Sequence, residues 1–230
     1  MLETVFLDAG GILLYPNWWR ISAALAAHGV EVAPETLQRA DPIARRELDD
    51  RRVIGGTTDA SRGWLFFDLI LAHAGIEKSN GTTAALVDLH AYHTASNLWE
   101  YVPPDVVPAL EALRARGLRL VVVSNANGTL RAHMDRLDMT RRFDHVLDSA
   151  DEGVEKPDPR FFEIALARSG AKKETTIHVG DLYHVDVIGA RNANLRGVLL
   201  DEADLRPDAD CPRVRTLAEL VEMISAGAFD

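Results

Sequence analysis

The stretch Val5-Phe6-Leu7-Asp8-Ala9-Gly10-Gly11-Ile12-Leu13 decides the fold. Three apolar residues lead into one aspartate, and two glycines then interrupt the run. A short apolar run that ends on glycines predicts a buried strand, which leaves Asp8 at its carboxyl end. Doubly wound sheets bind ligands at the carboxyl ends of their strands. Asp8 is therefore either a functional acid or a residue that caps the following turn.

Composition narrows the functions open to the chain. It has 230 residues, of which 47% are hydrophobic, enough for one large domain or a core with a smaller insert. The net charge is −10, and no basic run is present to bind phosphate backbones. We therefore expect no nucleic-acid or anionic-membrane partner. A small phosphorylated substrate remains compatible with an acidic protein, because one local site can be positive.

Three features bear on location. Cys211 is the only cysteine, so no internal disulfide can form. The chain begins on the predicted strand without a basic region and an apolar signal core. No apolar run reaches the length of about 18 residues that a membrane span needs. We expect a soluble, cytoplasmic protein, and no pattern indicates a particular oligomeric state.

Residues 15–98 show helical periodicity and almost no strand signal. Because a run of helices does not fit inside a βαβ unit, we expect an inserted all-helical domain between the first strand and the next. Gly55-Gly56 is expected to break the chain near its middle. The four expected helices lie around Ile21–His28, Pro34–Leu48, Trp64–Leu71 and Leu86–Leu98.

From Pro103 onward, strands and helices alternate. Residues 118–123 are apolar except for Arg119, as expected of a strand in a parallel sheet covered on both faces. Residues 1–14 and 99–230 should therefore form a Rossmann-like α/β core with a mainly parallel sheet. The further expected strands are His145–Leu147, Thr175–Val179 and Gly197–Leu200. The expected helices are Pro103–Arg116, Gly128–Leu137, Pro159–Ser169, His184–Ala193 and Leu217–Ile224.

Chemically reactive residues recur at or just past the predicted strand ends. A carboxylate can attack phosphorus and form an acyl phosphate that water then hydrolyses. A hydroxyl, a backbone amide and a lysine can stabilise the developing charge on the phosphoryl oxygens. Two neighbouring aspartates give an all-oxygen site suited to Mg²⁺, which offsets the repulsion between an acid and a phosphate. The residues are Asp8, Ser124-Asn125, Lys156 in Glu155-Lys156-Pro157, and Gly180-Asp181 with Asp186.

In this order and at these strand ends, the motifs resemble those of the haloacid dehalogenase superfamily of hydrolases, over nearly the whole chain. Asp8 matches the aspartate nucleophile of the first motif. Ser124 matches the serine or threonine of the second, and Lys156 matches the lysine of the third. Gly180-Asp181 with Asp186 matches the fourth. The helical insert resembles the family's helical cap, which closes over the site and selects substrates.

The resemblance implies a Mg²⁺-dependent phosphatase. It would hydrolyse a small phosphate ester or anhydride through an aspartyl-phosphate on Asp8. Asp8, Asp181 and the Gly10 carbonyl would hold the metal, and Asp186 would complete the metal site by orienting metal-bound water. Catalysis would depend on Asp8 together with Lys156. The phosphate group would be held by Ser124, Asn125 and Lys156.

Gly10 departs from the family's pattern. Phosphatases of the family usually carry a second aspartate at this position, which protonates the leaving group and then activates water. Glycine cannot move a proton, although its carbonyl can still bind metal. General acid–base catalysis typically raises the reaction rate by ~10²–10⁴-fold. The enzyme is therefore slow on poor leaving groups, or takes the proton from another residue such as His184, or performs other chemistry.

Three alternatives stay open. A non-catalytic or very slow phosphate-binding homologue would keep the same residues. The dehalogenase branch also lacks the second aspartate, but it works without metal and does not keep the Gly-Asp pair found at Gly180-Asp181. The phosphonate-cleaving branch uses a cap lysine, and the insert offers only Lys78, in an expected surface turn. Metal-dependent phosphatase chemistry is favoured over all three.

Overall fold

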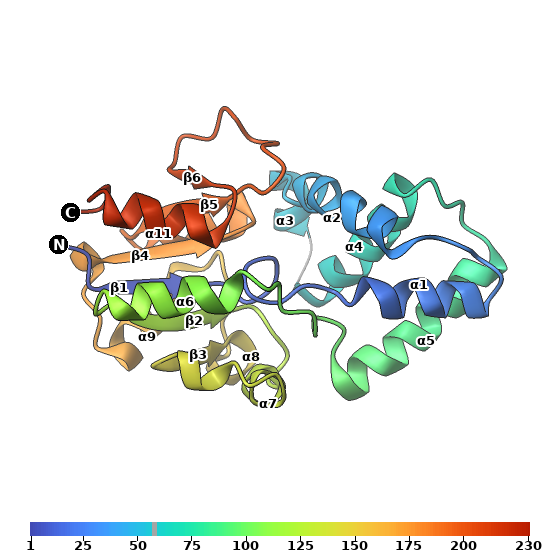
Figure 1. Ribbon diagram of the computed structural model, residues 1–230, viewed down its shortest axis with the longest axis horizontal. Helices are drawn as coiled ribbons and strands as arrows, with labels where there is room; N and C mark the ends of the chain where they lie inside the picture. Colours follow the sequence, from blue (N-terminus) through green and yellow to red (C-terminus); the bar gives the residue numbers. More distant parts are fainter. Residues whose placement is uncertain (57–58) are drawn as a thin grey trace. The chain divides into compact units, whose positions relative to one another are not determined.

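The computed structural model describes residues 1–56 and 59–230 (Figure 1). The chain forms two compact units. The α/β core consists of Met1–Leu14 and Val102–Asp230, and the helical unit consists of Tyr15–Tyr101. Residues 99–101, which were expected in the core, belong to the helical unit. The reason is that Tyr15 and Tyr101 pair through two backbone hydrogen bonds of 2.8 and 3.0 Å.

The α/β core is built on a parallel sheet with the strand order β3-β2-β1-β4-β5-β6. The five predicted strands are confirmed to within one residue at each end, and the Rossmann-like architecture is confirmed with them. β6 was not predicted, because a two-residue strand is too short to show a periodic pattern. The strands are β1 (Thr4–Leu7), β2 (Arg119–Ser124), β3 (His145–Asp148), β4 (Thr176–Gly180), β5 (Arg196–Leu200) and β6 (Arg213–Val214).

The register of β1 brings the reactive residues together. β1 lies between β2 and β4 and is fully buried. Its last residue, Leu7, pairs with Val122 of β2 and Val179 of β4. Because the three strands are parallel and in step, the residues at their carboxyl ends lie along one edge of the sheet. The reactive residues at that edge are Asp8, Ser124 and Asp181.

Helices flank the sheet (Figure 1). On one face, Phe6 and Val121 pack against Phe161 and Phe162 of α9 (Pro159–Ser169). Figure 1 shows α6 (Val106–Ala115) and α11 (Leu217–Ser225) side by side in front of the sheet, in contact with one another. The shorter helices of the core are α7 (Leu130–Arg136), α8 (Ser149–Glu152) and α10 (Ile188–Asn192), with 3₁₀ turns at Thr140–Arg142 and Lys173–Thr175.

One predicted helix of the core has a different geometry. The segment expected as a helix over His184–Ala193 begins as a π-helical turn, Tyr183–Val187, and continues as α10. The sequence pattern could not reveal this, because apolar spacing does not distinguish a π-turn from the first turn of an α-helix. Single π-turns of this kind occur frequently at functional sites.

The helical unit contains, among the described residues, α1 (Trp18–Ala27), α2 (Pro34–Leu48), α3 (Arg51–Gly56), α4 (Asp59–His73) and α5 (Asn80–Ser96). α3 was not predicted. The break expected at Gly55-Gly56 coincides with the end of α3, which stops at Gly56. The core of the unit is formed by apolar side chains from different helices, including Trp18, Ile21, Leu37, Ala44, Phe67, Ile70 and Leu89.

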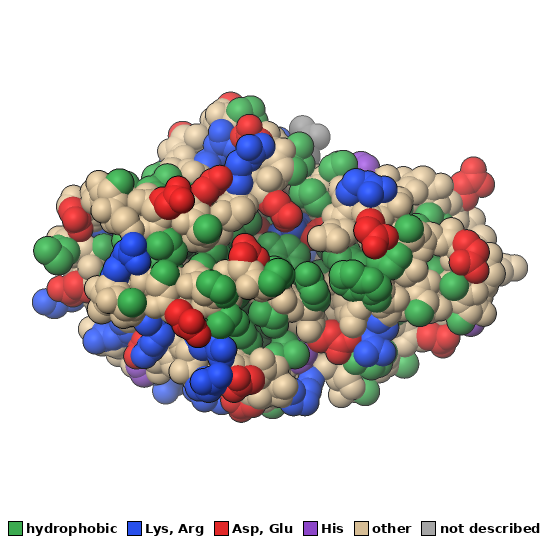
Figure 2. Space-filling view, viewed as in Figure 1, with side chains coloured by type: hydrophobic (Ala, Val, Ile, Leu, Met, Phe, Trp, Pro, Cys, Tyr) green, Lys and Arg blue, Asp and Glu red, His purple; other side chains and the backbone are tan. Residues whose placement is uncertain are grey.

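Two further properties concern the surface. None of the helices in the described part of the chain combines the length and the apolar character needed to cross a membrane. On the face that Figure 2 shows, Lys and Arg side chains are interspersed with Asp and Glu side chains. Charge of one sign therefore does not dominate this face.

Candidate functional site

Asp8 stands directly after β1, where the chain turns sharply. Its backbone N–H donates to the carbonyl of Val179 (2.9 Å), which keeps it in the sheet's register. Its Oδ1 accepts a hydrogen bond from the N–H of Ala9 (2.7 Å), and its side chain is 14% exposed. The carboxylate of Asp8 is therefore fixed in orientation and still reachable from solvent.

The loop after Asp8 folds back on the carbonyl of Ala9, which accepts from the N–H groups of Leu13 and Leu14 at 2.9 Å. Gly11 makes the turn with a φ of 71°, a conformation that favours glycine. Gly10 does not share this positive φ. The φ at position 10 therefore does not require glycine, and this position presents no side chain to the site.

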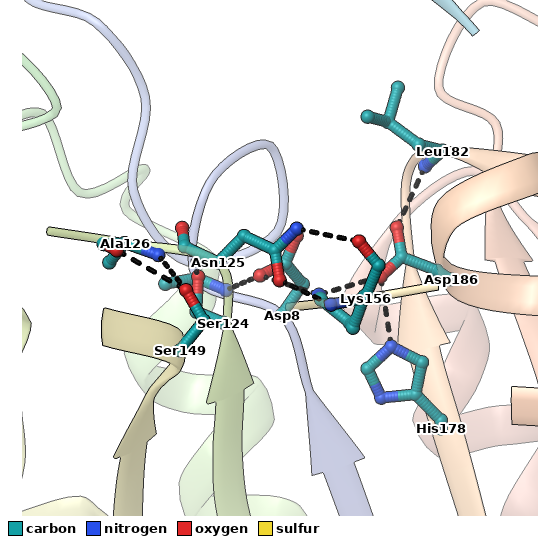
Figure 3. Close-up of polar contacts among 10 residues, drawn as sticks. Asp8, Ser124, Asn125, Ala126, Ser149, Lys156, His178, Leu182 and Asp186 are labelled. Atoms are coloured by element: carbon teal, nitrogen blue, oxygen red, sulfur yellow. Dashed lines mark hydrogen bonds and ion pairs between the residues drawn. The ribbon is translucent and has the colours of Figure 1, made fainter. Parts of the chain in front are cut away.

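Lys156 lies between Asp8 and Asp186 and links them (Figure 3). The Nζ atom of Lys156 is 3.0 Å from Oδ1 of Asp8 and 2.7 Å from Oδ1 of Asp186. The side chains of Lys156 and Asp186 are fully buried. Burial opposes the charge on Lys156, but the two carboxylates outweigh it and raise the pKa of this amine above its usual range. Lys156 is thus a buried ammonium ion shared by two acids.

Asp186 is held by three donors. Its Oδ1 accepts from Lys156 Nζ and from His178 Nε2 (2.9 Å), and its Oδ2 accepts from the N–H of Leu182 (3.0 Å). Burial alone would raise the pKa of Asp186, but Lys156 and the hydrogen bond from His178 lower it well below its usual range. Asp186 is therefore a carboxylate in the folded protein.

Gly180 allows Asp186 to reach this place. A Cβ atom at Gly180 would overlap the carboxyl carbon and the Cβ of Asp186. The backbone at the start of the π-turn also contributes, because the N–H of Asp186 donates a 2.7 Å hydrogen bond to the carbonyl of Leu182. The spacing of Gly180-Asp181 and Asp186 thus has a steric cause that the sequence pattern alone does not express.

Asp8, Asp181 and Asp186 form an acidic cluster. One carboxylate oxygen from each lies within 4.8 Å of the others. Burial raises the pKa of Asp8, Lys156 lowers it, and the negative charge of Asp186 raises it again, with a net upward shift. Three carboxylates with oxygens this close form an all-oxygen donor set, which suits a divalent cation such as Mg²⁺. The three aspartates predicted for the metal therefore do come together.

Ser124 and Asn125 occupy different roles. Ser124 is buried at the end of β2, where its hydroxyl lowers the pKa of the Asp8 carboxyl group and donates to the carbonyl of Asn125 (3.4 Å). Asn125 instead braces the backbone of Lys156: its Oδ1 accepts from the Lys156 N–H (2.8 Å) and its Nδ2 donates to the Lys156 carbonyl (2.9 Å). The structure therefore gives the Asn125 amide a positioning contact, and the direct phosphate contact predicted from the sequence stays a prediction.

Sequence reasoning missed three supporting residues. Asp148, at the end of β3, accepts from the N–H groups of Gly128 (2.8 Å) and Leu130 (3.1 Å). The hydroxyl of Ser149 accepts from the N–H of Ala126 (3.1 Å) and donates to its carbonyl (3.2 Å), as Figure 3 shows. Both residues shape the loop after Ser124. An acid at a strand end was a usable signal for Asp148. The third, His178, lay inside an apolar run and gave no such signal.

Lys78, the lysine considered for phosphonate cleavage, lies in the helical unit. It pairs with Asp68 at 3.0 Å, and the Lys78 side chain is 76% exposed. His184, considered as a proton source, lies in the π-turn of the core, where its ring packs edge-on against Tyr183 at 5.2 Å. Neither contact indicates a reactive group.

A family model for haloacid dehalogenase-like hydrolases matches residues 2–194. The chain belongs to this family. The match begins before β1 and ends after α10, so it includes every residue of the acidic cluster and Lys156.

Phosphatases of known substrate are among the relatives of this hydrolase. A ribulose-1,5-bisphosphate 5-phosphatase of Halopiger xanaduensis is 32% identical over 194 residues, which cover 79% of each chain. A glyceraldehyde 3-phosphate phosphatase of Methanopyrus kandleri is 32% identical over 170 residues, or 69% of this chain and 72% of the relative. The protein is therefore an enzyme of the family's phosphatase-like branch.

The fold is also shared with a solved structure, a haloacid dehalogenase-like hydrolase of Bacillus subtilis bound to magnesium. The two chains superpose with a TM-score of 0.68 over 97% of this chain and 98% of that one, at 18% identity. A likeness at this level of identity establishes the common fold.

Proposed function

We propose that this hydrolase removes the phosphoryl group from small phosphorylated metabolites through an aspartyl-phosphate on Asp8. The observation that carries the proposal is the position of Lys156, 3.0 Å from Asp8 and 2.7 Å from Asp186. A buried cation beside a partly exposed carboxylate stabilises the negative charge that develops when a phosphoryl group is transferred there. Small phosphate esters are also the substrates that the names of the relatives describe.

The proposed reaction consists of two displacements at phosphorus. Ala9 and Lys156 both contact Oδ1 of Asp8, so Oδ2 is the proposed attacking atom. Its lone pair forms an O–P bond while the bond from phosphorus to the leaving oxygen breaks, and the leaving oxygen keeps that electron pair. Water then attacks the phosphorus of the aspartyl-phosphate, the bond to Asp8 breaks, and the carboxylate and inorganic phosphate are released.

The acidic cluster is the proposed metal site. We assign Asp8, Asp181 and the Gly10 carbonyl as ligands of Mg²⁺. Asp186 already accepts three hydrogen bonds from the protein, which favours an orienting role for it over direct ligation. When bound, the ion supplies the positive charge that allows an anionic phosphate to approach an anionic nucleophile.

The proposed phosphate site uses the hydroxyl of Ser124 and the ammonium group of Lys156. Asn125 contributes indirectly, because its amide fixes the backbone of Lys156. We further propose that the helical unit, which is inserted between β1 and β2, is the cap that selects the substrate.

Because position 10 is a glycine, we expect the leaving group of the substrate to determine the rate of turnover. An alkoxide needs a proton as the P–O bond breaks, whereas a nitrophenolate or a carboxylate does not. With no acid at position 10, we expect turnover to fall steeply as the pKa of the leaving group rises. The same observation supports the second candidate, a homologue that binds phosphate and turns it over very slowly.

A substrate screen tests the proposal. The purified protein is incubated with phosphorylated metabolites and with 4-nitrophenyl and acetyl phosphate, with Mg²⁺ or with a chelator. We expect Mg²⁺-dependent release of phosphate, abolished in Asp8→Asn and retained in Asp68→Asn, which changes an exposed acid of the helical unit. Tight phosphate binding without turnover of any substrate would favour the second candidate. Undiminished turnover in Asp8→Asn would place the nucleophile elsewhere.

A further inference from the structure

His178 lies in the middle of β4, two residues before Gly180, and is fully buried. Its Nε2 atom is 2.9 Å from Oδ1 of Asp186. The same oxygen lies 2.7 Å from Nζ of Lys156 (Figure 3). One carboxylate oxygen is therefore shared by the imidazole and by the ammonium ion that contacts Asp8.

The partners of His178 define its tautomer. A carboxylate only accepts hydrogen bonds, so Nε2 must carry the proton. Within the described residues, Nδ1 has no hydrogen-bond partner. A doubly protonated ring would thus bury an unpaired N–H donor, which is costly. The ring of Phe162 meets the imidazole edge-on at 4.9 Å. The surroundings therefore match a neutral ring with its hydrogen on Nε2.

β4 gives this donor a rigid base. His178 pairs with Phe6 of β1 on one side and with Gly197 of β5 on the other. Asp186, in contrast, comes from a short π-turn. The hydrogen bond from His178 thus ties the carboxylate of that turn to the centre of the sheet.

We propose that His178 is a positioning residue for the hydrolysis proposed above: it fixes Asp186, and through Asp186 it holds Lys156 against Asp8. The inference rests on the proposed function. His178 touches neither the nucleophile nor the phosphate site, so it acts only through Asp186. Substituting a residue that orients the groups of a catalytic centre commonly lowers activity by about 10–100-fold.

Three variants of β4 separate positioning from mere packing. His178→Leu keeps most of the volume and removes the donor. His178→Gln keeps an N–H donor near the position of Nε2. Thr176→Val is the matched control: Thr176 is fully buried on the same face of β4, and the substitution removes its hydrogen bond to the carbonyl of Lys172 (2.6 Å).

We expect kcat of His178→Leu to fall by about 10–100-fold, with a smaller change in KM. His178→Gln should recover most of this loss, and Thr176→Val should keep the kcat of the wild type whatever it does to the melting temperature. A folded His178→Leu variant with the kcat and the Mg²⁺ dependence of the wild type would overturn the proposal. Equal losses in all three variants would also overturn it, because they would indicate a packing effect.

Nitrogen-15 NMR of the metal-free protein tests the inference without turnover. The wild type should show His178 with its proton on Nε2. The Lys156 ammonium signal should shift in His178→Leu but not in Thr176→Val. A proton on Nδ1, or a Lys156 signal that does not shift in His178→Leu, would refute the positioning role. If the wild type hydrolyses no phosphate, the proposed function fails, and these spectra still decide whether His178 positions Lys156.

Discussion

Two groups of interacting charges, one in each unit, show what distinguishes a reactive site from a structural one. In the helical unit, Glu100 accepts from Arg20 (2.7 Å), Tyr92 (2.8 Å) and Asn17 (2.9 Å). One acid there faces one cation. In the α/β core, Asp8 and Asp186 share the ammonium of Lys156, and a carboxylate oxygen of Asp181 lies within 4.8 Å of an oxygen of each.

The difference lies in the charge left over. The group around Glu100 is balanced and needs nothing more, and it ties residues near the start of the helical unit to residues near its end. In the group around Lys156, two carboxylates share one ammonium, so a further cation beside them would be stabilising. An unbalanced, partly exposed charge cluster therefore indicates function more strongly than the mere presence of buried ions.

Lys156→Met should produce the largest loss of stability. It leaves Asp8 and Asp186 without their shared cation in a buried position, and removing one partner of a buried ion pair costs about 3–5 kcal/mol. Urea unfolding measures the effect. The matched control is Lys78→Met, which removes a lysine that is 76% exposed and should change stability by less than about 0.5 kcal/mol. Equal effects of the two substitutions would show that Lys156 contributes no buried ion pair.

Mg²⁺ should stabilise the core cluster and have no effect through the Glu100 group. A ligand at 100 times its Kd adds about 2.7 kcal/mol to stability. Thermal unfolding with increasing Mg²⁺ should show this gain in the wild type and in Glu100→Gln. Asp181→Asn should lose it, because the substitution removes one of the proposed ligands. A gain that survives Asp181→Asn would place the ion elsewhere.

Gly10→Asp should sharpen the comparison by restoring an acid at the core site. The backbone at Gly10 does not have a positive φ, so a positive φ does not strain an aspartate at this position. We expect a gain of ~10²-fold on alkyl phosphates and a much smaller gain on 4-nitrophenyl phosphate. Steady-state kinetics with both substrates tests this. A wild type that already hydrolyses alkyl phosphates fast, with no gain in the variant, would mean that another residue supplies the proton.

The Glu100 group should show a modest dependence of stability on pH. Burial opposes the charge of Glu100, but the hydrogen bonds from Arg20, Tyr92 and Asn17 lower its pKa below the ordinary value of 4.5. Because the folded-state pKa is the lower one, the stabilisation is present above pH 4.5 and is lost as pH falls through the folded-state pKa.

The check is the free energy of unfolding of the wild type and of Glu100→Gln as a function of pH. The wild type should be more stable at neutral pH, by about 1 kcal/mol, and the two curves should converge in acid. A difference that stays constant with pH would mean that the charge of Glu100 does not contribute.

The sequence predicted the parts of the fold that local patterns encode. β1 and β2 are apolar runs, and their ends carry Asp8 and Ser124, so both the strands and their reactive ends were recognisable. α3 and β6 were missed because each is short. The π-turn was missed because its apolar residues have the same spacing in the sequence as those of an α-helix.

The site residues that escaped prediction depend on contacts between distant segments. Nothing near Asn125 in the sequence indicates that its amide meets the backbone of Lys156, 31 positions later. His178 occupies a strand position that normally holds an apolar side chain, and its partner Asp186 lies on the following turn. Such contacts follow from strand order and register, which single-sequence patterns do not contain.

The most direct test of the account is to find the phosphoryl group on the protein during turnover. The enzyme is mixed with a substrate that it hydrolyses and quenched in acid, and its peptides are mapped by mass spectrometry. We predict a phosphoryl group on the peptide that contains Asp8 in the wild type and none in Asp8→Asn. Turnover with a phosphoryl group on another residue, or with no phosphorylated peptide under single-turnover conditions, would contradict the account.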